Sequence, residues 1–482
     1  MNNYINNIEF EPLSEKIFNK LNNIFSKCQF QITEYSLGTL IIYDNILHSK
    51  FHIDNNYLII KFNYNNEIIF QYPIVTINEN NDEIEFLALL KIEEYCMLNN
   101  LSLNIVNIPE AKIDKIIKRY PNININCIRK NKDYIYNAKE LIDFPGRVYS
   151  KKKNLINQFN KNYINSNFRR LTIDDINIIN DFFIEYEKSI IKEKTKEVLE
   201  ELLFSKIIFQ YLKYDFFYAG GLFIDNKLVG INISEISGNT LITHIEKALY
   251  QYKGIYTKLM NECYKNFPKI FDYINRENDM NDKGLRKAKY QYKPLYLLNK
   301  YWIKCDNIYF NKITKLPSIQ TERLLINEIL EEDIKLYNEL IYDLDRNKLW
   351  GNDDIADAKN ILKIDNLNDN SFFNVQEYYF NNKIQISLAI RLNKILIGEV
   401  LLYNYDFRGN IEIGIRINKK YNNLGYGIEA FNAICDYALY DLGFNKVKAK
   451  CLKENIQSKK MILKRMHCIN EDEKYIFFES DI

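Results

Sequence analysis

Two glycines stand directly before an amphipathic segment near the end of the chain. The stretch YNNLGYGIEAFNAICDYALYDLGF holds Gly425 and Gly427, and apolar residues recur after them at every third or fourth position up to Gly443. This spacing predicts a helix that packs on a sheet through one face. The first turn of a helix exposes unpaired backbone N–H groups, and glycines let a pyrophosphate approach them closely. The stretch is therefore a candidate phosphate-binding turn, and a tight turn without a ligand is the alternative.

Side chains that could move a proton or hold a reactant flank this turn. Glu412 lies in the alternating stretch NIEIGIRIN before it, and Asn455 and Ser458 lie in ENIQSKKMILKRM after it. An amine is protonated at pH 7, so it must lose a proton to a base such as Glu412 before it can attack a thioester. The alternatives are a solvated strand residue at Glu412 and a helix N-cap at Asn455.

A weaker version of the same arrangement lies in the middle of the chain. In THIEKALYQYKGIYTKLM, Gln251 and Gly254 precede a helical segment, and Tyr256 stands two residues after the glycine. Upstream, His244 and Glu246 alternate onto one face of a predicted strand and could transfer protons together. A sheet histidine that bonds to a neighbour is the commoner case.

A dense group of polar side chains follows in DYINRENDMNDKGLRKAK. Its members are Asn275, Arg276, Glu277, Asp279, Arg286 and Lys289. Such a group suits an anionic or zwitterionic ligand, and a solvated helix face explains part of it.

The middle and C-terminal parts share an order of elements: strand, helix, apolar hairpin, strand, glycine turn and helix. Their hairpins, IDNKLVGINI and RLNKILIGEVLL, both turn at Asn-Lys and carry a glycine in the second strand. A duplicated unit is the prediction. Residues 1–150 are expected to form a degenerate further copy, residues 151–305 the second unit and residues 318–482 the third.

Composition limits the functional classes. The chain has 482 residues, with 65 basic and 63 acidic side chains, so it lacks the basic excess of a dedicated nucleic-acid binder. Eight cysteines form no C-x-x-C pair, which fits a reducing, cytoplasmic setting. Every window of 18 residues contains at least one charged side chain, so the sequence predicts no membrane-spanning segment. We expect no metal site and no DNA partner.

Residues 318–482 resemble the GNAT superfamily of acyl-CoA-dependent N-acyltransferases, in particular the branch that acetylates ribosomal proteins. The pyrophosphate motif of that family, Q/R-x-x-G-x-G/A, is matched by NNLGYG with Asn422 in place of Gln or Arg, and its strand x-E-I-G-Y by IEIGI. The resemblance implies acetyl-CoA as the acyl donor and a primary amine of a peptide or small molecule as the acceptor. It implies Glu412 as the base and Ser458 near the leaving thiolate. The positions that it implies for contact with the coenzyme are Ile417, Asn422, Leu424, Gly425, Tyr426, Gly427 and Asn455.

Residues 1–302 resemble the family named for the C-terminal domain of phosphatidylglycerol lysyltransferase, through DFPGRVYSKKKNLINQF, FYAGGLFIDNKLVG and DYINRENDMNDKGLRKAKYQYKP. That family is built of two GNAT-like units in tandem. The fold class expected for the whole chain is therefore α/β (α+β), with three units that each have a mixed, mostly antiparallel sheet flanked by helices. Gln251 and Gly254 fit the pyrophosphate motif, but the Tyr256 ring would crowd a pyrophosphate.

Three functions follow for comparison. The leading one is acetyl transfer by the C-terminal unit from acetyl-CoA to an amine. The second is aminoacyl transfer from aminoacyl-tRNA to a lipid or peptide by the tandem unit, with His244 and Glu246 as its proton-transfer pair. The third is a non-catalytic tandem that presents a substrate.

Overall fold

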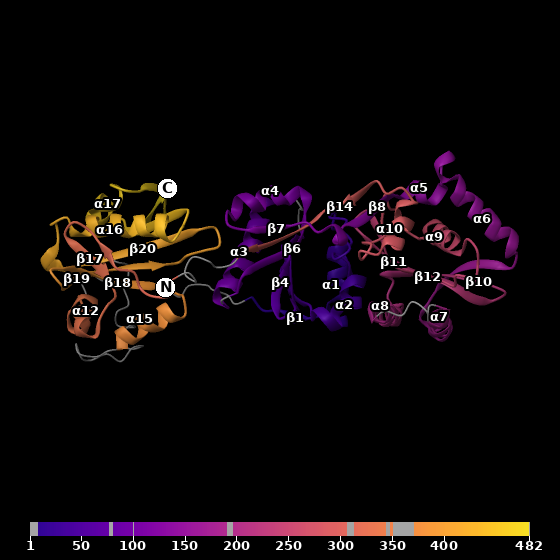
Figure 1. The fold of residues 1–482 in the computed structure, drawn as a ribbon, viewed down its shortest axis with the longest axis horizontal. Helices are drawn as coiled ribbons and strands as arrows, with labels where there is room; N and C mark the ends of the chain where they lie inside the picture. Colours follow the sequence, from indigo (N-terminus) through magenta and orange to yellow (C-terminus); the bar gives the residue numbers. More distant parts are fainter. Residues whose placement is uncertain are drawn as a thin grey trace. The chain divides into compact units, whose positions relative to one another are not determined.

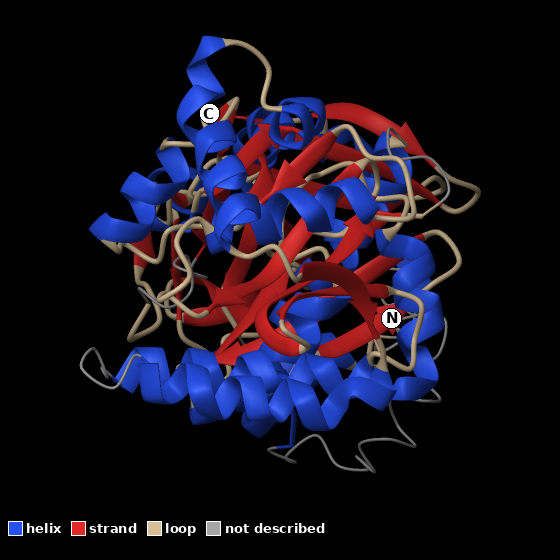
Figure 2. Cartoon of the chain, turned by 90° about the vertical axis from the view of Figure 1, so that its right-hand side faces the viewer, coloured by secondary structure: helices blue, strands red, loops and turns tan. Residues whose placement is uncertain are grey.

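The computed structural model describes residues 8–76, 81–99, 101–189, 196–305, 313–343, 348–349 and 371–481. They fall into two compact units. The first comprises residues 1–99, 103–116 and 124–304, and the second comprises residues 305–482 with the short segments 100–102 and 117–123. Strands lie between helices, as Figure 2 shows for the first unit. No helix among the described residues is long and apolar enough to cross a membrane.

The first unit contains two mixed sheets (Figure 1). The first sheet has the order β1 (Glu11–Pro12), β2 (Lys50–Ile53), β3 (Tyr57–Tyr64), β4 (Glu67–Gln71), β6 (Leu103–Pro109), β15 (Lys300–Cys305) and β7 (Asn124–Asn126), with β5 (Ile74–Val75) paired to β3. The second has the order β14 (Tyr296–Leu298), β8 (Asp133–Asn137), β13 (Tyr273–Asn275), β12 (Thr240–Ala248), β11 (Lys227–Ser237), β10 (Phe217–Ile224) and β9 (Ser166–Leu171). The helices of this unit are α1 (Glu15–Phe25), α2 (Leu37–Leu47), α3 (Asp82–Leu98), α4 (Glu110–Arg119), α5 (Ala138–Asp143), α6 (Ser150–Asn162), α7 (Ile176–Ser189), α8 (Lys196–Ile207), α9 (Ile255–Asn266) and α10 (Lys283–Tyr290).

The second unit is built on a third sheet. Its order is β16 (Ile319–Gln320), β17 (Leu324–Asn327), β18 (Ile386–Leu392), β19 (Ile395–Tyr403), β20 (Asn410–Ile417), β21 (Lys446–Leu452), β23 (Tyr475–Asp481) and β22 (His467–Glu471). Among the described residues of this unit, the helices are α12 (Ile334–Ile341), α15 (Ser371–Asn381), α16 (Tyr426–Asp436) and α17 (Ile456–Ile462). The apolar face predicted for the helix that follows Gly425 is buried, because Phe431, Cys435 and Ala438 belong to the core of this sheet.

The three sheets share a pattern that confirms the expected fold class. Each sheet has one parallel pair of strands next to a run of antiparallel strands. The parallel pairs are β4 with β6 in the first sheet, β12 with β13 in the second and β20 with β21 in the third. A helix connects the two strands of each pair: α3, α9 and α16 respectively. The division of the chain into three domains stays a prediction.

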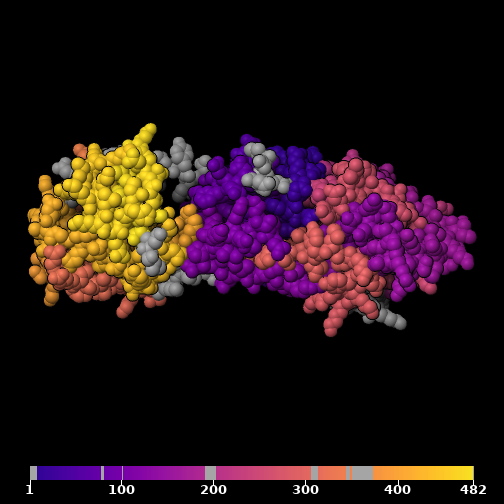
Figure 3. Space-filling view, turned by 90° about the horizontal axis from the view of Figure 1, so that it is seen from above, coloured from indigo at the N-terminus to yellow at the C-terminus, as the bar shows by residue number. Residues whose placement is uncertain are grey.

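The two sheets of the first unit exchange a strand. The strand next to β13 is β8, which comes from the first part of the chain, whereas the strand next to β6 is β15, which comes from the end of the unit. Figure 3 shows salmon-coloured residues from this end next to the purple ones from the first part of the chain. In the third sheet the strand at the equivalent place, next to β21, is β23, which comes from the same part of the chain as the rest of that sheet. Each sheet of the first unit is therefore complete only with a strand from the other half of that unit.

Candidate functional site

The turn before α16 has the conformation that the glycines predicted. Gly425 is the N-cap of α16 with φ +83, and Gly254 is the N-cap of α9 with φ +86. Residues with a Cβ rarely adopt such φ values. Because both glycines follow a strand of a parallel pair and begin a helix, the structure places the two turns at equivalent positions. Around Gly425 the turn is open, since Asn423, Leu424 and Gly425 are exposed.

The two turns differ in the second residue of the helix that follows, which is Gly427 in α16 and Tyr256 in α9. Gly427 has space: a Cβ built there would lie 3.4 Å from Met461 Sδ and 3.7 Å from Ile417 Cγ1, which are ordinary contacts. Tyr256 occupies the same helical position in α9, and its ring packs 5.5 Å from that of Tyr250. The α9 turn is also covered, because a Cβ on Gly254 would lie only 2.7 Å from the carbonyl oxygen of Leu155 in α6.

A cation lies on the open turn. Arg323 donates from Nε to Glu429 at 2.7 Å and from Nη1 to the carbonyl oxygen of Leu424 at 3.0 Å, and its guanidinium lies 4.6 Å from the ring of Tyr426. A Cβ on Gly425 would be 3.1 Å from Arg323 Nη2. The arginine thus holds the turn against the first residues of α16, and Glu429 balances its charge.

The parallel strands β20 and β21 separate at Glu412. Their pairing runs from Asn410 with Lys446 to Glu412 with Lys448, whereas β20 continues to Ile417, where its side chain is buried. Between Glu412 and the glycine turn, the edge of β20 that faces β21 therefore pairs with no strand among the residues that the structure describes. An extended ligand that enters at the turn could run along this edge to Glu412.

Glu412 is held by three side chains. It accepts a hydrogen bond from Tyr403 Oη at 2.7 Å and from Asn404 Nδ2 at 2.9 Å, and Lys450 Nζ lies 3.2 Å from its Oε1. Burial, and then the Glu412 charge, raise the pKa of Tyr403, so Tyr403 keeps its proton for this bond. Glu412 keeps 15% of its side chain exposed, which leaves it reachable from solvent.

Asn455 is the N-cap of α17, as the sequence indicated. Its side chain accepts a hydrogen bond from Ser458 N at 3.0 Å and donates from Nδ2 to the carbonyl oxygen of Leu349 at 3.1 Å. Burial raises the pKa of the nearby Cys451 thiol, and a hydrogen bond with the side chain of Ser458 opposes that rise. Asn455 and Ser458 thus have structural partners, and their contacts with coenzyme stay predictions. Asn422 ends the short 3₁₀ turn that precedes the glycines.

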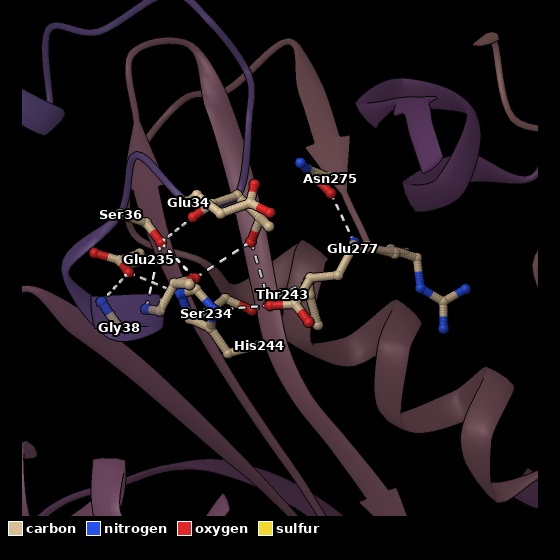
Figure 4. A network of polar contacts seen from close by, with 12 residues as sticks. Glu34, Ser36, Gly38, Ser234, Glu235, Thr243, His244, Asn275 and Glu277 are labelled. Carbon is tan, nitrogen blue, oxygen red and sulfur yellow. Dashed lines mark hydrogen bonds and ion pairs between the residues drawn. The ribbon is translucent and has the colours of Figure 1, made fainter. Parts of the chain in front are cut away.

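His244 lies in a buried cluster in the first unit (Figure 4). Its Nε2 is 2.7 Å from Glu235 and its Nδ1 is 3.0 Å from Glu277. Burial disfavours the imidazolium, but the two carboxylates outweigh this effect and raise the pKa of His244 to about 9. Glu235 also accepts from the backbone N–H groups of Leu37 and Gly38 at the start of α2. The cluster therefore ties β11 and β12 to α2.

His244 and Glu246 do not share a partner. The register between β11 and β12 shifts at Ile233 and Ser234, which leaves His244 as the extra residue of a bulge. Glu246 instead accepts from Arg276 Nη2 at 2.9 Å. The alternation rule assumed a regular strand, and the bulge breaks it. A joint proton transfer stays a prediction.

The charged His244 gives a pH-dependent contribution to stability. Its pKa in the folded state, about 9, lies above its ordinary value, so its stabilisation is complete below about pH 6.5 and is lost as the pH rises through 9. We expect the free energy of unfolding of the wild type, minus that of His244→Gln, to fall by up to about 3 kcal/mol between pH 6 and pH 9.5.

Urea unfolding at several pH values measures this difference. Burial lowers the pKa values of Lys152 and Lys289 to about 8, so these two lysines make the folded protein more stable as the pH rises. Because the variant has the same lysines, subtracting its free energy of unfolding from that of the wild type removes their effect. A difference that does not change with pH would show that folding does not raise the pKa of His244.

Several residues of these sites were not identified from the sequence. Arg323, Tyr403, Asn404, Lys450 and Glu235 were missed. The only signal for Tyr403 is its place at the end of the strand that leads into the Glu412 hairpin. For Glu235, nothing local indicates that it bonds to α2, nearly two hundred residues earlier.

Comparison with known families agrees with this architecture. Residues 25–304, more than half of the chain, match the family described as phosphatidylglycerol lysyltransferase, C-terminal. The chain belongs to this family. Residues 323–466 match the acetyltransferase (GNAT) domain. Both resemblances expected from the sequence are confirmed, and this member of the lysyltransferase family, with its GNAT domain, is an acyltransferase enzyme.

Individual relatives cover parts of this family member. An uncharacterized protein of Mycoplasmoides gallisepticum is 21% identical over 48% of this chain and 73% of its own length. An uncharacterized N-acetyltransferase of Bacillus subtilis is 32% identical over 84 residues. This match covers 17% of this chain and about half (49%) of that protein. A conserved protein of unknown function from Bacteroides thetaiotaomicron has a crystal structure that matches 62% of this chain and 99% of its own, with 22% identity and a TM-score of 0.56. This last likeness shows a shared fold.

Proposed function

We propose that the C-terminal unit transfers an acetyl group from acetyl-CoA to a primary amine. The observation that carries the proposal is the separation of β20 from β21 at Glu412, on a strand that ends at an open glycine turn. The turn offers backbone N–H groups to a pyrophosphate. The free edge of β20 offers backbone groups to an extended pantetheine arm.

The chemistry at the strand separation suits amine acylation. Glu412 accepts a proton from the acceptor ammonium, and the free amine then attacks the thioester carbonyl. Tyr403 and Asn404 hold the carboxylate in place through the two hydrogen bonds that they donate. The leaving group is the coenzyme A thiolate, and Ser458, at the start of α17 next to Cys451, is the candidate to stabilise it.

The direct test is calorimetric titration of acetyl-CoA into the full-length protein, followed by assay of free thiol release with a panel of primary amines. Saturable binding at one site per chain and amine-dependent thiol release support the proposal. Absence of binding would reject it.

A second function for the first unit is supported by a buried ion pair. Arg276 and Glu246 have side chains only 13% and 11% exposed. Among the described residues, Arg276 Nη1 and Glu246 Oε2 are buried without a hydrogen-bond partner. Buried polar atoms are nearly always paired. One free donor beside one free acceptor fits the carbonyl and ammonium of an aminoacyl group, so we propose aminoacyl transfer as the alternative activity of this unit.

Unmodified protein can test this alternative. We expect lysine amide to bind to the full-length chain in calorimetry, whereas Nα-acetyl-lysine amide, which lacks the α-ammonium for Glu246, binds at least about tenfold more weakly. Equal affinities, or no binding of either compound, would favour the third possibility, a tandem that does not act on aminoacyl groups.

A further inference from the structure

The face of β21 that is turned away from α16 carries a row of lysines. Residues of this strand alternate between partly exposed and buried. Val447, Ala449 and Cys451 are 0%, 4% and 5% exposed and belong to the same core as α16. Successive side chains of a strand point to opposite faces, so the alternating Lys446, Lys448 and Lys450 share the other face.

Lys448 lies beside the candidate base. It is the register partner of Glu412 in the parallel pair, directly where the two strands separate. Register partners on neighbouring strands are about 4.8 Å apart and point to the same face. An acceptor whose amine reaches Glu412 therefore comes within reach of the Lys448 ammonium.

Lys448 differs from its two neighbours in its pairing. Lys446 Nζ lies 2.7 Å from Glu479, and Lys450 Nζ lies 3.2 Å from Glu412. Glu479 is also the register partner of Lys448 on β23, but its carboxylate pairs with Lys446. Among the residues that the structure describes, none forms an ion pair or hydrogen bond with the side chain of Lys448, although it is partly buried.

We propose that the acceptor carries an anionic group next to its amine and that Lys448 binds this group. This inference rests on the proposed acetyl transfer at Glu412. A partly buried ammonium without a partner keeps an unmet preference for an anion. The carboxylates nearest to it already have cationic partners, so the missing anion is supplied by the substrate.

The phosphates of acetyl-CoA do not account for Lys448. They are assigned to the glycine turn, which follows Ile417, and Ile417 lies five residues beyond Glu412 on an extended strand. At about 3.3 Å per residue this separation is roughly 16 Å, beyond the reach of a lysine side chain. Lys448 is therefore expected to affect selection of the acceptor and to leave coenzyme affinity unchanged.

Matched acceptors measure this selection in the full-length protein. The peptide pair is Ser-Asp-Ala-Ala against Ser-Asn-Ala-Ala, with amidated carboxyl ends, and the small-molecule pair is glucosamine 6-phosphate against glucosamine. In at least one pair we expect kcat/KM to be higher for the anionic member by about tenfold or more. The pair that shows the preference distinguishes a peptide acceptor from a small one.

Variants assign the preference to Lys448. In Lys448→Gln the ratio within the preferred pair should fall to about one, and in Lys448→Arg it should persist, while the dissociation constant for acetyl-CoA is unchanged in both. Lys446→Gln is the matched control, because Lys446 is already paired with Glu479, and it should keep the ratio. Turnover without an anionic preference, or a preference that survives in Lys448→Gln, overturns this inference alone. No turnover with any acceptor rejects the proposed function and this inference with it.

Discussion

The Gly427→Val variant of the full-length chain is expected to keep its fold and to lose acetyl-CoA binding by about 100-fold or more. A Cβ at Gly427 meets only ordinary contacts with Met461 and Ile417, so the protein without ligand tolerates a Cβ there. The bound pyrophosphate would occupy the same space. Loss of two hydrogen bonds to a charged phosphate, at about 1.5–3 kcal/mol each, corresponds to at least that factor. Calorimetric titration measures the affinity, and circular dichroism checks the fold.

Graded controls make this experiment specific. Gly427→Ala should weaken binding much less than Gly427→Val, because alanine adds only one methyl group whereas valine adds two more on its Cβ. In the α9 turn, Tyr256 stands at the position of Gly427 and the carbonyl group of Leu155 lies against Gly254, so no second site should remain in Gly427→Val. Tight residual binding in a folded variant would contradict the phosphate-binding role of the α16 turn and would make the first unit the coenzyme site.

The Glu412→Gln variant is expected to lower the turnover number for amine acetylation by about 10²–10⁴-fold, the usual contribution of a general base. Glutamine keeps the size of the side chain and an oxygen to accept from Tyr403, but it cannot take a proton from the ammonium. Because Glu412 lies at the strand separation rather than at the glycine turn, the dissociation constant for acetyl-CoA should stay nearly the same. Thiol-release kinetics and calorimetry measure the two quantities separately.

Glu479→Gln is the matched control for this variant. Glu479 lies on the same sheet and pairs with Lys446, so its loss removes an ion pair without removing the proposed base. A Glu412→Gln enzyme that turns over at the wild-type rate would exclude Glu412 as the base. A Glu479→Gln enzyme with an equally large defect would show that any charge change on this face reduces activity.

The local features of the third sheet were predictable because short-range patterns produce them. A positive φ is accessible mainly to glycine, and a period near 3.6 requires a helix, so Gly425 and α16 followed from adjacent residues. The N-cap at Asn455 needs only the backbone three residues on. The expected sheets flanked by helices followed in the same way, from alternating strands and from the family resemblance.

The partners of the polar side chains were not predictable, because strand register and topology bring them together. Glu412 lies against Lys450 only because β20 and β21 pair in parallel and in one register. His244 and Glu246 are separated by a bulge of one residue, which the period-two rule cannot reveal. The exchange of β8 and β15 joins strands from opposite halves of the first unit. Such long-range pairings depend on which surfaces the whole chain can bury together, and neighbouring residues carry no signal for that choice.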